Sequence, residues 1–287
     1  NVSVSFGARV LFDEASFSVS YGDKIGLIGR NGTGKSTFLK MLLGKIEPDS
    51  GDIEVPDYYT LGDLEQHIHF EKKTVMEEVA SVLPLGRAHE EWKGEKILQG
   101  LGFSDEQMMG DPSSLSGGWQ IKVNLAKLLL TEPSMLLLDE PTNYLDIYSI
   151  RWLANFLKEW EGELILITHD KSFMDSVINS TLIIHRGKFR KMAGTTDRVK
   201  QQIATEEEIY EKTRQKEEEK KHEIEAWVRR FGAKASLASQ AKARMKQVER
   251  MDIKVKLADI ANLEFDFTYK PYGSSNEMVQ ARNLTFG

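Results

Sequence analysis

The chain has 287 residues, of which 40% are hydrophobic and 29% charged, and its formal net charge is −6. This composition is ordinary for a globular protein with a sizeable core. The absence of cysteine excludes a disulfide scaffold, a cysteine-ligated zinc site and thiol catalysis. The negative charge argues against a protein that coats nucleic acid over its whole surface.

No uninterrupted apolar run approaches the roughly 18 residues of a membrane-spanning helix, so we expect no membrane association. The chain begins at Asn1, and no basic and apolar leader follows it. We therefore expect a cytoplasmic protein, and we expect this chain to be a piece of a longer gene product.

Short apolar runs alternate with helical patterns over residues 1–194. Residues 10–21 alternate apolar and polar side chains, which predicts a half-buried strand. Buried parallel strands are predicted by the apolar runs at residues 24–28, 135–138 and 164–168. Helical periodicity follows at residues 120–130 and 147–160. Strands that alternate with helices predict an α/β domain.

The composition changes after residue 194. Residues 197–231 contain no proline or glycine and place apolar residues in shared heptad phases, which predicts one long helix. Gly232 suits the end of that helix, and a second apolar row through residues 237–255 predicts a helix that returns antiparallel to the first. We expect a helical hairpin over residues 195–262, with a solvated charged linker helix as the alternative.

The two ends of the chain match in residue type. Val4-Ser5-Phe6-Gly7 near the start corresponds to Leu284-Thr285-Phe286-Gly287 at the end. Placed at both ends, this match predicts that residues 263–287 begin a second copy of the first domain.

Charge is concentrated near the predicted hairpin turn. Residues 228–256 contain nine basic and two acidic residues, a local charge of +7 in a chain of −6. Such a segment predicts a polyanion-binding surface, although phosphate contacts do not distinguish RNA from DNA. The predicted contact residues are Arg229, Arg230, Lys234, Lys242, Arg244 and Lys246.

Residues 29–37 read G-R-N-G-T-G-K-S-T and fit the phosphate-binding pattern G-x-x-x-x-G-K-[ST] between a predicted strand and a predicted helix at residues 36–43. Its glycines let backbone N–H groups surround phosphate oxygens, and the helix N-terminus adds partial positive charge. Lys35 is predicted to reach the β- and γ-phosphates and Ser36 to bind Mg²⁺. The predicted nucleotide-binding residues of this loop are Gly29, Arg30, Asn31, Gly32, Thr33, Gly34, Lys35, Ser36 and Thr37.

Two further segments suit the same chemistry. The apolar strand that starts at Met135 ends in Asp139 and Glu140, so Asp139 is predicted to hold Mg²⁺ beside the phosphate loop and Glu140 to face an attacking water. Ser116, Gly117 and Gly118 precede a predicted helix and would form a second anion site. A simple helix cap is the alternative for this second segment.

The order of these motifs, with Gln66, residues 141–146 and His169, resembles the nucleotide-binding domain of an ABC ATPase. The forms L-S-G-G-W at residues 115–119 and E-P-T-N-Y-L-D at 140–146 resemble the F subfamily, whose members are soluble tandem proteins. Residues 234–236 and 241–244 are similar to its inter-domain linker. The resemblance implies a P-loop α/β core with an antiparallel β subdomain and a helical subdomain, followed by the hairpin.

The resemblance also implies roles for single residues. Gln66 would sense Mg²⁺ and the γ-phosphate, His169 would contact the γ-phosphate, and Asp146 would lie at a domain interface. Phe6 would stack on adenine, with a core aromatic as the alternative. The implied catalytic residues are Glu140, His169 and Gln66, and the implied metal ligands are Ser36, Gln66 and Asp139.

The function implied is an ATPase that couples ATP-driven closure of two domains to ribosome binding. The second domain would lie in the same chain or be supplied by a homodimer. The short stretch between Gln66 and Ser114 puts contacts of an inserted helical arm in doubt. A nucleic-acid-binding or DNA-repair ATPase remains an alternative, and the ATPase subunit of a membrane transporter is a weaker one.

Overall fold

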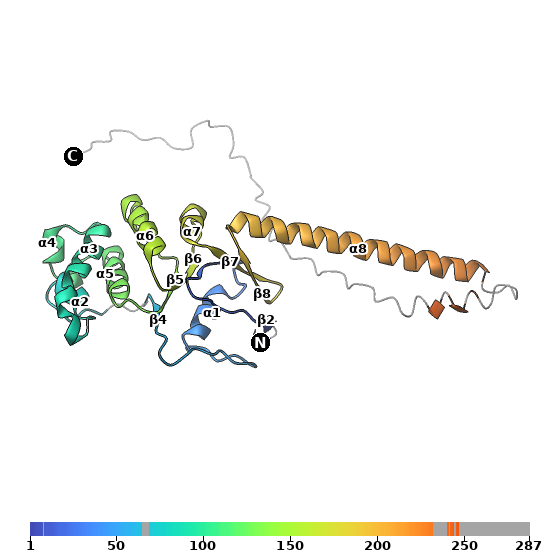
Figure 1. Ribbon diagram of the computed structural model, residues 1–287, viewed down its shortest axis with the longest axis horizontal. Coiled ribbons are helices and arrows are strands. Elements are labelled where there is room, and N and C mark those ends of the chain that lie inside the picture. The colour runs from blue at the N-terminus through green and yellow to red at the C-terminus, as the bar shows by residue number, and fades with distance from the viewer. Residues whose placement is uncertain (8, 65–68, 232–239, 241, 244, 247–287) are drawn as a thin grey trace, which may run out of the picture. The chain divides into compact units, whose positions relative to one another are not determined.

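The computed structural model describes residues 1–7, 9–64, 69–231, 240, 242–243 and 245–246 (Figure 1). The chain forms two compact units, residues 1–206 and residues 207–287.

A six-stranded sheet with the order β4-β5-β6-β3-β7-β8 forms the centre of the first unit. Its strands are β3 Lys24–Ile28, β4 Leu61–Asp63, β5 Met135–Asp139, β6 Glu163–Ile167, β7 Ser180–His185 and β8 Lys188–Ala193. All neighbours are parallel except β7 and β8. Every residue of β6 is buried, as expected for a parallel strand covered on both faces. The three predicted parallel strands are therefore confirmed.

A small antiparallel sheet pairs β1 Val2–Phe6 with β2 Arg9–Ala15. The predicted strand over residues 10–21 is therefore too long. Ala15 pairs with Val2, the first residue of β1, so the residues after Ala15 have no described partner in this sheet. Phe17 still packs into the core, with its ring 5.1 Å from that of Phe38. The apolar alternation beyond Ala15 therefore reflects the burial of alternate side chains and not the pairing of the backbone with a neighbouring strand.

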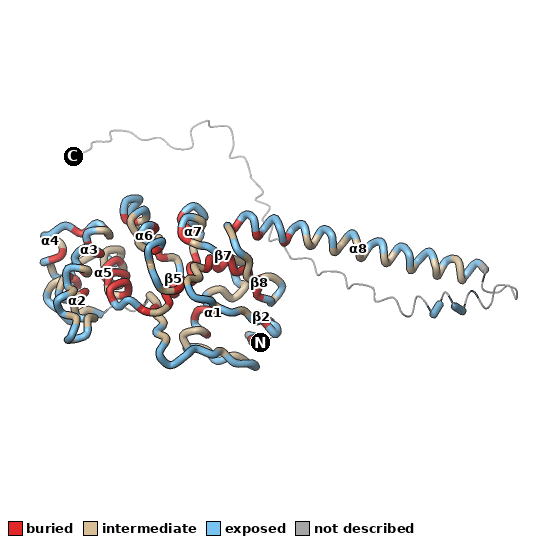
Figure 2. Tube along the Cα trace, in the orientation of Figure 1, coloured by how far each residue is buried: buried red, intermediate tan, exposed pale blue. Residues whose placement is uncertain are grey.

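Helices cover both faces of the sheet (Figure 2). They are α1 Lys35–Leu42, α2 Val75–Ala80, η1 Leu85–Glu90, α3 Glu91–Gly100, α4 Asp105–Met108, η2 Pro112–Ser114, α5 Gly117–Leu130, α6 Ile147–Glu159 and α7 Lys171–Val177. Leu136 and Leu138 of β5 face the helical layer that includes α3, α5 and α6, whereas Met135 and Leu137 face α1 and the small sheet. This period of two lets one apolar strand serve two cores.

The longest helix, α8 Thr196–Phe231, begins in the first unit and continues in the second. It confirms the helix predicted over residues 197–231. Gly232, most of the returning helix and residues 263–287 lie outside the described residues, so the hairpin and the second domain stay predictions. None of the described helices combines the length and the apolar character of a membrane span.

Candidate nucleotide site

Three segments that were predicted to act together leave the same edge of the central sheet. The neighbouring strands β5, β6 and β3 are parallel, so their carboxyl ends share one edge. Asp139 ends β5, His169 follows β6, and Gly29 follows β3. Ligands of open α/β sheets bind at this kind of edge.

The phosphate loop is shaped by backbone conformations that favour glycine. Gly32 and Gly34 have φ angles of 75° and 99°, and a Cβ atom on Gly34 would lie 2.8 Å from the ring of Phe12. Gly34 precedes α1 and provides no side-chain cap, so N–H groups of the first helical turn are available to an anion. The Lys35 Nζ atom lies back over the loop and donates to the carbonyl oxygens of Gly29 at 2.9 Å and Arg30 at 3.4 Å.

Ser36 and Asp139 meet across the sheet edge. The Ser36 hydroxyl donates to Oδ2 of Asp139 over 2.8 Å. These two oxygen atoms are hard donors of the kind that suits Mg²⁺, which usually takes its remaining ligands from phosphates and water. In keeping with so sparse a donor set, the described part of the chain holds no group of three or more His, Asp or Glu side chains suited to a metal. Gln66 lies outside the described residues.

Glu140 turns away from Asp139 and toward the end of β6. Its φ angle of 54° is in the left-handed region, which is uncommon and costly for a residue with a side chain. Its backbone N–H donates to the carbonyl oxygen of Ile167 over 2.8 Å. One carboxylate oxygen accepts from the backbone N–H of His169 at 3.2 Å, and the other lies 3.5 Å from His169 Nε2. Two of the three predicted catalytic residues, Glu140 and His169, are therefore in contact, which the sequence did not reveal.

The segment with Ser116, Gly117 and Gly118 begins α5. Ser116 occupies the N-cap position, but its side chain makes no capping hydrogen bond. Ser116 and Gly117 are exposed, and a Cβ atom on Gly117 would meet nothing within 4 Å. A simple serine cap does not account for this geometry, which leaves a hydroxyl and helix N–H groups open to a ligand.

Residues 12–143 match a family model described as ABC transporter, and residues 182–267 match a second model with the same description. The chain contains an ABC-type ATP-binding domain. A solved structure titled as the ATP-binding subunit of an ABC transporter matches this fold with a TM-score of 0.60 at 26% identity, and the match covers 71% of this chain and 91% of that one.

Two curated relatives from Bacillus subtilis (strain 168) are similar to nearly the whole chain. YdiF is 33% identical over an alignment 328 residues long, and this alignment covers 99% of this chain and 51% of YdiF. YfmM, named an uncharacterized ABC transporter ATP-binding protein, is 32% identical over an alignment 329 residues long. This alignment covers 100% of this chain and 63% of YfmM. The chain thus spans between half and two thirds of the length of these relatives.

A buried lysine in the ABC domain was missed at the sequence level. Lys122 of α5 donates to the carbonyl oxygen of Leu101 at 2.9 Å and to Oδ2 of Asp146 at 2.9 Å, and its Nζ lies 4.3 Å from the ring centroid of Trp119. Asp146 caps α6, and its pKa is lowered by the Ser149 N–H and by Lys122. Lys122 therefore ties the helix of Ser116–Gly118 to the segment that follows Glu140. The available signal was a lysine within an apolar helical run, which also contains Lys127.

For the remaining predicted residues the structure gives only a local position, and some of them lie outside the described residues. Phe6 is the last residue of β1 and pairs in register with Arg9. Arg229 and Arg230 are exposed near the end of α8, and Lys242 and Lys246 are exposed helical residues. Lys234 and Arg244 lie outside the described residues. The positions of these residues do not test whether they bind adenine or a polyanion.

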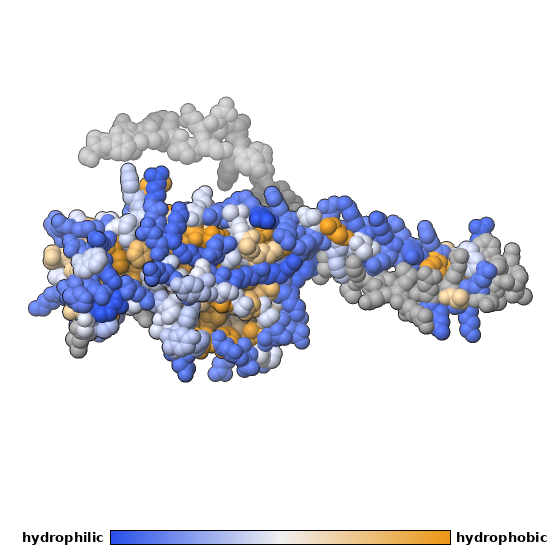
Figure 3. Space-filling view, viewed as in Figure 1, coloured by the Kyte–Doolittle hydropathy of each residue, from blue (hydrophilic) through white to orange (hydrophobic). Residues whose placement is uncertain are grey.

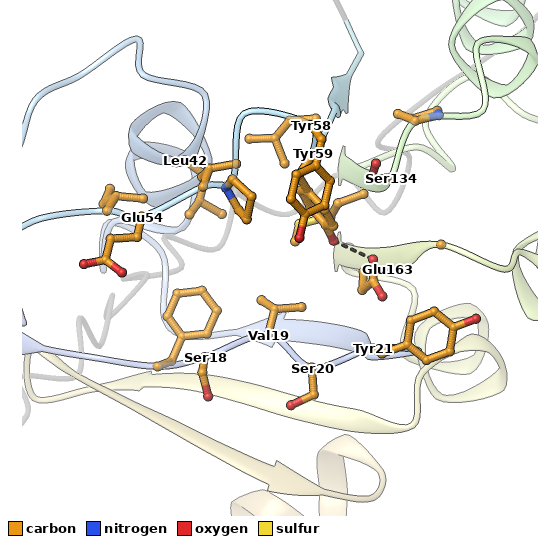
Figure 4. A pocket seen from close by; sticks show the side chains of 18 of the residues that line it. Ser18, Val19, Ser20, Tyr21, Leu42, Glu54, Tyr58, Tyr59, Ser134 and Glu163 are labelled. Atoms are coloured by element: carbon orange, nitrogen blue, oxygen red, sulfur yellow. Dashed lines mark hydrogen bonds between the residues drawn. The ribbon is translucent and has the colours of Figure 1, made fainter.

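An open groove of about 1480 Å³ lies at the other edge of the sheet in the ABC domain. The face of the molecule drawn in Figure 3 is mostly hydrophilic, with hydrophobic patches between the hydrophilic residues. It is lined by Tyr21, Ser134 and Gly162, which precede β3, β5 and β6, so it lies at the starts of the strands. Inside it the Tyr59 hydroxyl donates to Glu163 over 2.5 Å (Figure 4), and burial together with Glu163 raises the pKa of Tyr59. This groove is therefore separate from the nucleotide edge.

Proposed function

We propose that this chain is the ATP-binding and ATP-hydrolysing first half of a cytoplasmic tandem ABC protein of the F subfamily. The observation that carries the proposal is the 2.8 Å hydrogen bond between Ser36 of the phosphate loop and Asp139. It joins the phosphate-binding segment to the strand end that also carries Glu140. A helix N-terminus, a cation and two acids at one sheet edge suit a nucleoside triphosphate.

Binding begins at the phosphate loop. Lys35 exchanges its present acceptors, the carbonyl oxygens of Gly29 and Arg30, for the β- and γ-phosphates of ATP. Both sets of hydrogen bonds come from an ammonium, but the phosphate oxygens carry negative charge and the carbonyl oxygens do not. Coulombic attraction therefore favours the exchange and the nucleotide-bound state. Ser36 and Asp139 are positioned to hold Mg²⁺, which would neutralise charge on the phosphates.

Hydrolysis needs a base near the γ-phosphate. Glu140 accepts a proton from water while the water oxygen forms a bond to the γ-phosphorus. The bond from that phosphorus to the bridging oxygen breaks, and ADP leaves with the electron pair. His169 holds the Glu140 carboxylate through its backbone N–H, and its exposed imidazole, with 76% of the side chain accessible, can approach the γ-phosphate.

The site on one domain is incomplete without another domain. Ser116 and Gly117 are exposed at the N-terminus of α5, and we propose that they cover ATP bound to a second ABC domain. That domain lies in the remainder of the tandem protein or in a second copy of this chain. Nucleotide binding would close the pair and hydrolysis would reopen it.

Lys35→Ala tests the nucleotide part of the proposal. Loss of the ammonium should weaken binding of a fluorescent ATP analogue by roughly 10-fold or more, in line with hydrogen bonds to charged groups. Lys40→Ala, an exposed lysine on the same helix α1, should bind as tightly as the parent. Equal affinity of Lys35→Ala and the parent would contradict the phosphate-loop assignment.

The proposed partner is the ribosome, contacted through RNA by the basic segment at residues 228–256. Counterion release predicts steep salt dependence, with a log–log slope of about −0.7 to −0.9 per phosphate neutralised. A DNA-repair ATPase is the alternative with the same charge requirement. A transporter subunit would not need this basic segment.

Co-sedimentation of the full tandem protein with ribosomes, in a non-hydrolysable ATP analogue and over a salt series, tests the partner. Reversal of Arg229, Arg230, Lys242 and Arg244 to Glu should weaken binding and flatten its salt dependence. The matched control reverses four exposed lysines of the ABC domain, Lys40, Lys72, Lys73 and Lys158. Equal binding by both quadruple variants, or binding to DNA but not to ribosomes, would contradict the ribosome proposal.

A further inference from the structure

The first residue of α8 is capped by a side chain from another helix. Thr196 is only 2% exposed, its backbone N–H donates to Asp175 Oδ1 at 2.9 Å, and its hydroxyl donates to Asp175 Oδ2 at 3.2 Å. Asp175 lies on α7, and Lys171 of the same helix pairs with Asp197. Asp175 therefore caps the N-terminus of α8, a role that an N-cap residue usually plays from within the same helix. The start of α8 is attached to α7.

The next turns of α8 contact the strand that leads into the phosphate loop. Val199 and Ile203 are 1% and 5% exposed and cluster with Ile183 of β7. Ile28, the last residue of β3, packs against this cluster. Because Gly29 follows directly, the base of α8 contacts the chain immediately before the phosphate loop.

The helix α7 connects this attachment to the other side of the nucleotide edge. It begins at Lys171, just after His169, and Asp170 caps it by accepting from the Phe173 N–H at 2.9 Å. It packs closely on β3, because a Cβ atom on Gly26 would lie 2.8 Å from side-chain atoms of Met174 and Ile178. We therefore expect α7 to transmit a displacement of His169 to Asp175.

We propose that Asp175 is a positioning residue that makes His169 and the base of α8 move together. This inference rests on the proposed function, in which His169 and Glu140 approach the γ-phosphate. ATP then changes the environment of residues 196–206, and a force on α8 changes how His169 presents the Glu140 carboxylate. Coupling between two sites is reciprocal in binding free energy, so whatever α8 binds affects nucleotide affinity in the same measure.

The test compares Asp175→Ala with Asp175→Asn in the 287-residue chain. Asparagine can still accept from the Thr196 N–H with its carbonyl oxygen and donate to the Thr196 hydroxyl with its amide, so it is the conservative variant. Glu95→Ala, an exposed acid on α3, is the matched control. The readouts are the equilibrium affinity for a non-hydrolysable ATP analogue, amide hydrogen exchange of residues 196–206 with and without the analogue, and kcat and KM at one fixed, high chain concentration.

In the parent chain the analogue should slow exchange in residues 196–206. Asp175→Ala should bind the analogue within about twofold of the parent, lose this response, and show kcat lowered roughly 3- to 10-fold at unchanged KM, the range expected for lost hydrogen bonds. Asp175→Asn and Glu95→Ala should keep the response. A purely structural cap would raise exchange in α8 without removing its dependence on the analogue.

Two outcomes separate the coupling from the proposed function. If the parent binds the analogue but residues 196–206 do not respond, the coupling is wrong and the nucleotide site stands. If the parent does not bind the analogue, the proposed function fails and takes the coupling with it. Should Asp175→Ala not fold, Thr196→Val removes the hydroxyl bond and should weaken the response. A response in Thr196→Val equal to that of the parent overturns the role of the Asp175 contacts.

Discussion

The first unit and the part of α8 beyond residue 206 are stabilised in different ways. In the first unit, β5 and β6 bury apolar side chains against helices that are distant in sequence. Residues 207–230 of α8 contain no buried residue, and ion pairs between neighbours occur along this stretch, such as those of Arg214 with Glu211 and Glu218, both at 2.7 Å. Substitutions should therefore have large effects in the first unit and small effects along α8.

The largest effect should come from Glu140→Gln at the nucleotide edge. Glutamine keeps the shape of the side chain but cannot accept the proton of the attacking water, so kcat should fall by about 100-fold or more. Binding of ATP should persist, because Lys35 and the loop N–H groups are unchanged. Glu159→Gln, an exposed acid at the end of α6, is the control. Turnover by Glu140→Gln at the parental rate would remove Glu140 as the base.

The next largest effect should be on stability, from Lys122→Met. The change removes the ammonium donor from the carbonyl oxygen of Leu101 and from Oδ2 of Asp146, both of which keep the Ser149 hydroxyl as a neighbour. Asp146 is half exposed, so the free energy of unfolding should fall by about 2 kcal/mol, less than for a fully buried pair. Urea unfolding measures it, with Lys158→Met as an exposed control. A loss no greater than the control's would show that the Lys122 contacts do not stabilise the unit.

A smaller effect should appear as pH dependence through Glu78. Although burial alone would raise its pKa, hydrogen bonds from Lys127 and from the N–H groups of Lys72 and Glu71 hold the pKa below its usual range. A lowered folded-state pKa stabilises the protein above the unfolded value of about 4.3. This stabilisation is lost as pH falls below that value.

Urea unfolding over a pH series measures the contribution of Glu78. Glu78→Gln should lower the free energy of unfolding at pH 7 and flatten its decline in acid. Its neighbour Glu77, which is exposed, supplies the control Glu77→Gln. Equal acid dependence in Glu78→Gln and the parent would contradict the account.

The smallest effect should come from Arg214→Ala on α8. Pairs at i,i+3 and i,i+4 on an exposed helix contribute little and are screened by salt. The far-ultraviolet circular dichroism signal of the helix should weaken slightly at low salt and match the parent at high salt. Unfolding of the first unit should not change. A cooperative loss of stability in the first unit would contradict the difference between the two regions.

Local pattern and motif order were enough to predict the strands β3, β5 and β6 and the long helix α8. They also predicted which segments meet, because parallel strands bring Gly29, Asp139 and His169 to one edge. The end of β2 at Ala15 could not be predicted, since it depends on where its partner strand β1 begins.

Contacts between side chains distant in sequence were also beyond prediction. The partners of Lys122 include a carbonyl oxygen on Leu101 and a carboxylate on Asp146. The cap of α8 comes from Asp175 on a different helix. No periodicity encodes such contacts, because they arise only when the chain has packed.

The central claim is that this chain holds one half of a shared ATP site. ATP turnover measured against the concentration of the 287-residue chain tests it most directly, with Glu140→Gln as the background. Because Ser116 and Gly117 must come from a second copy, the rate per chain should be low in dilute solution and rise with concentration as chains pair. A rate per chain that is constant over the whole range and comparable to that of the tandem protein would contradict the claim.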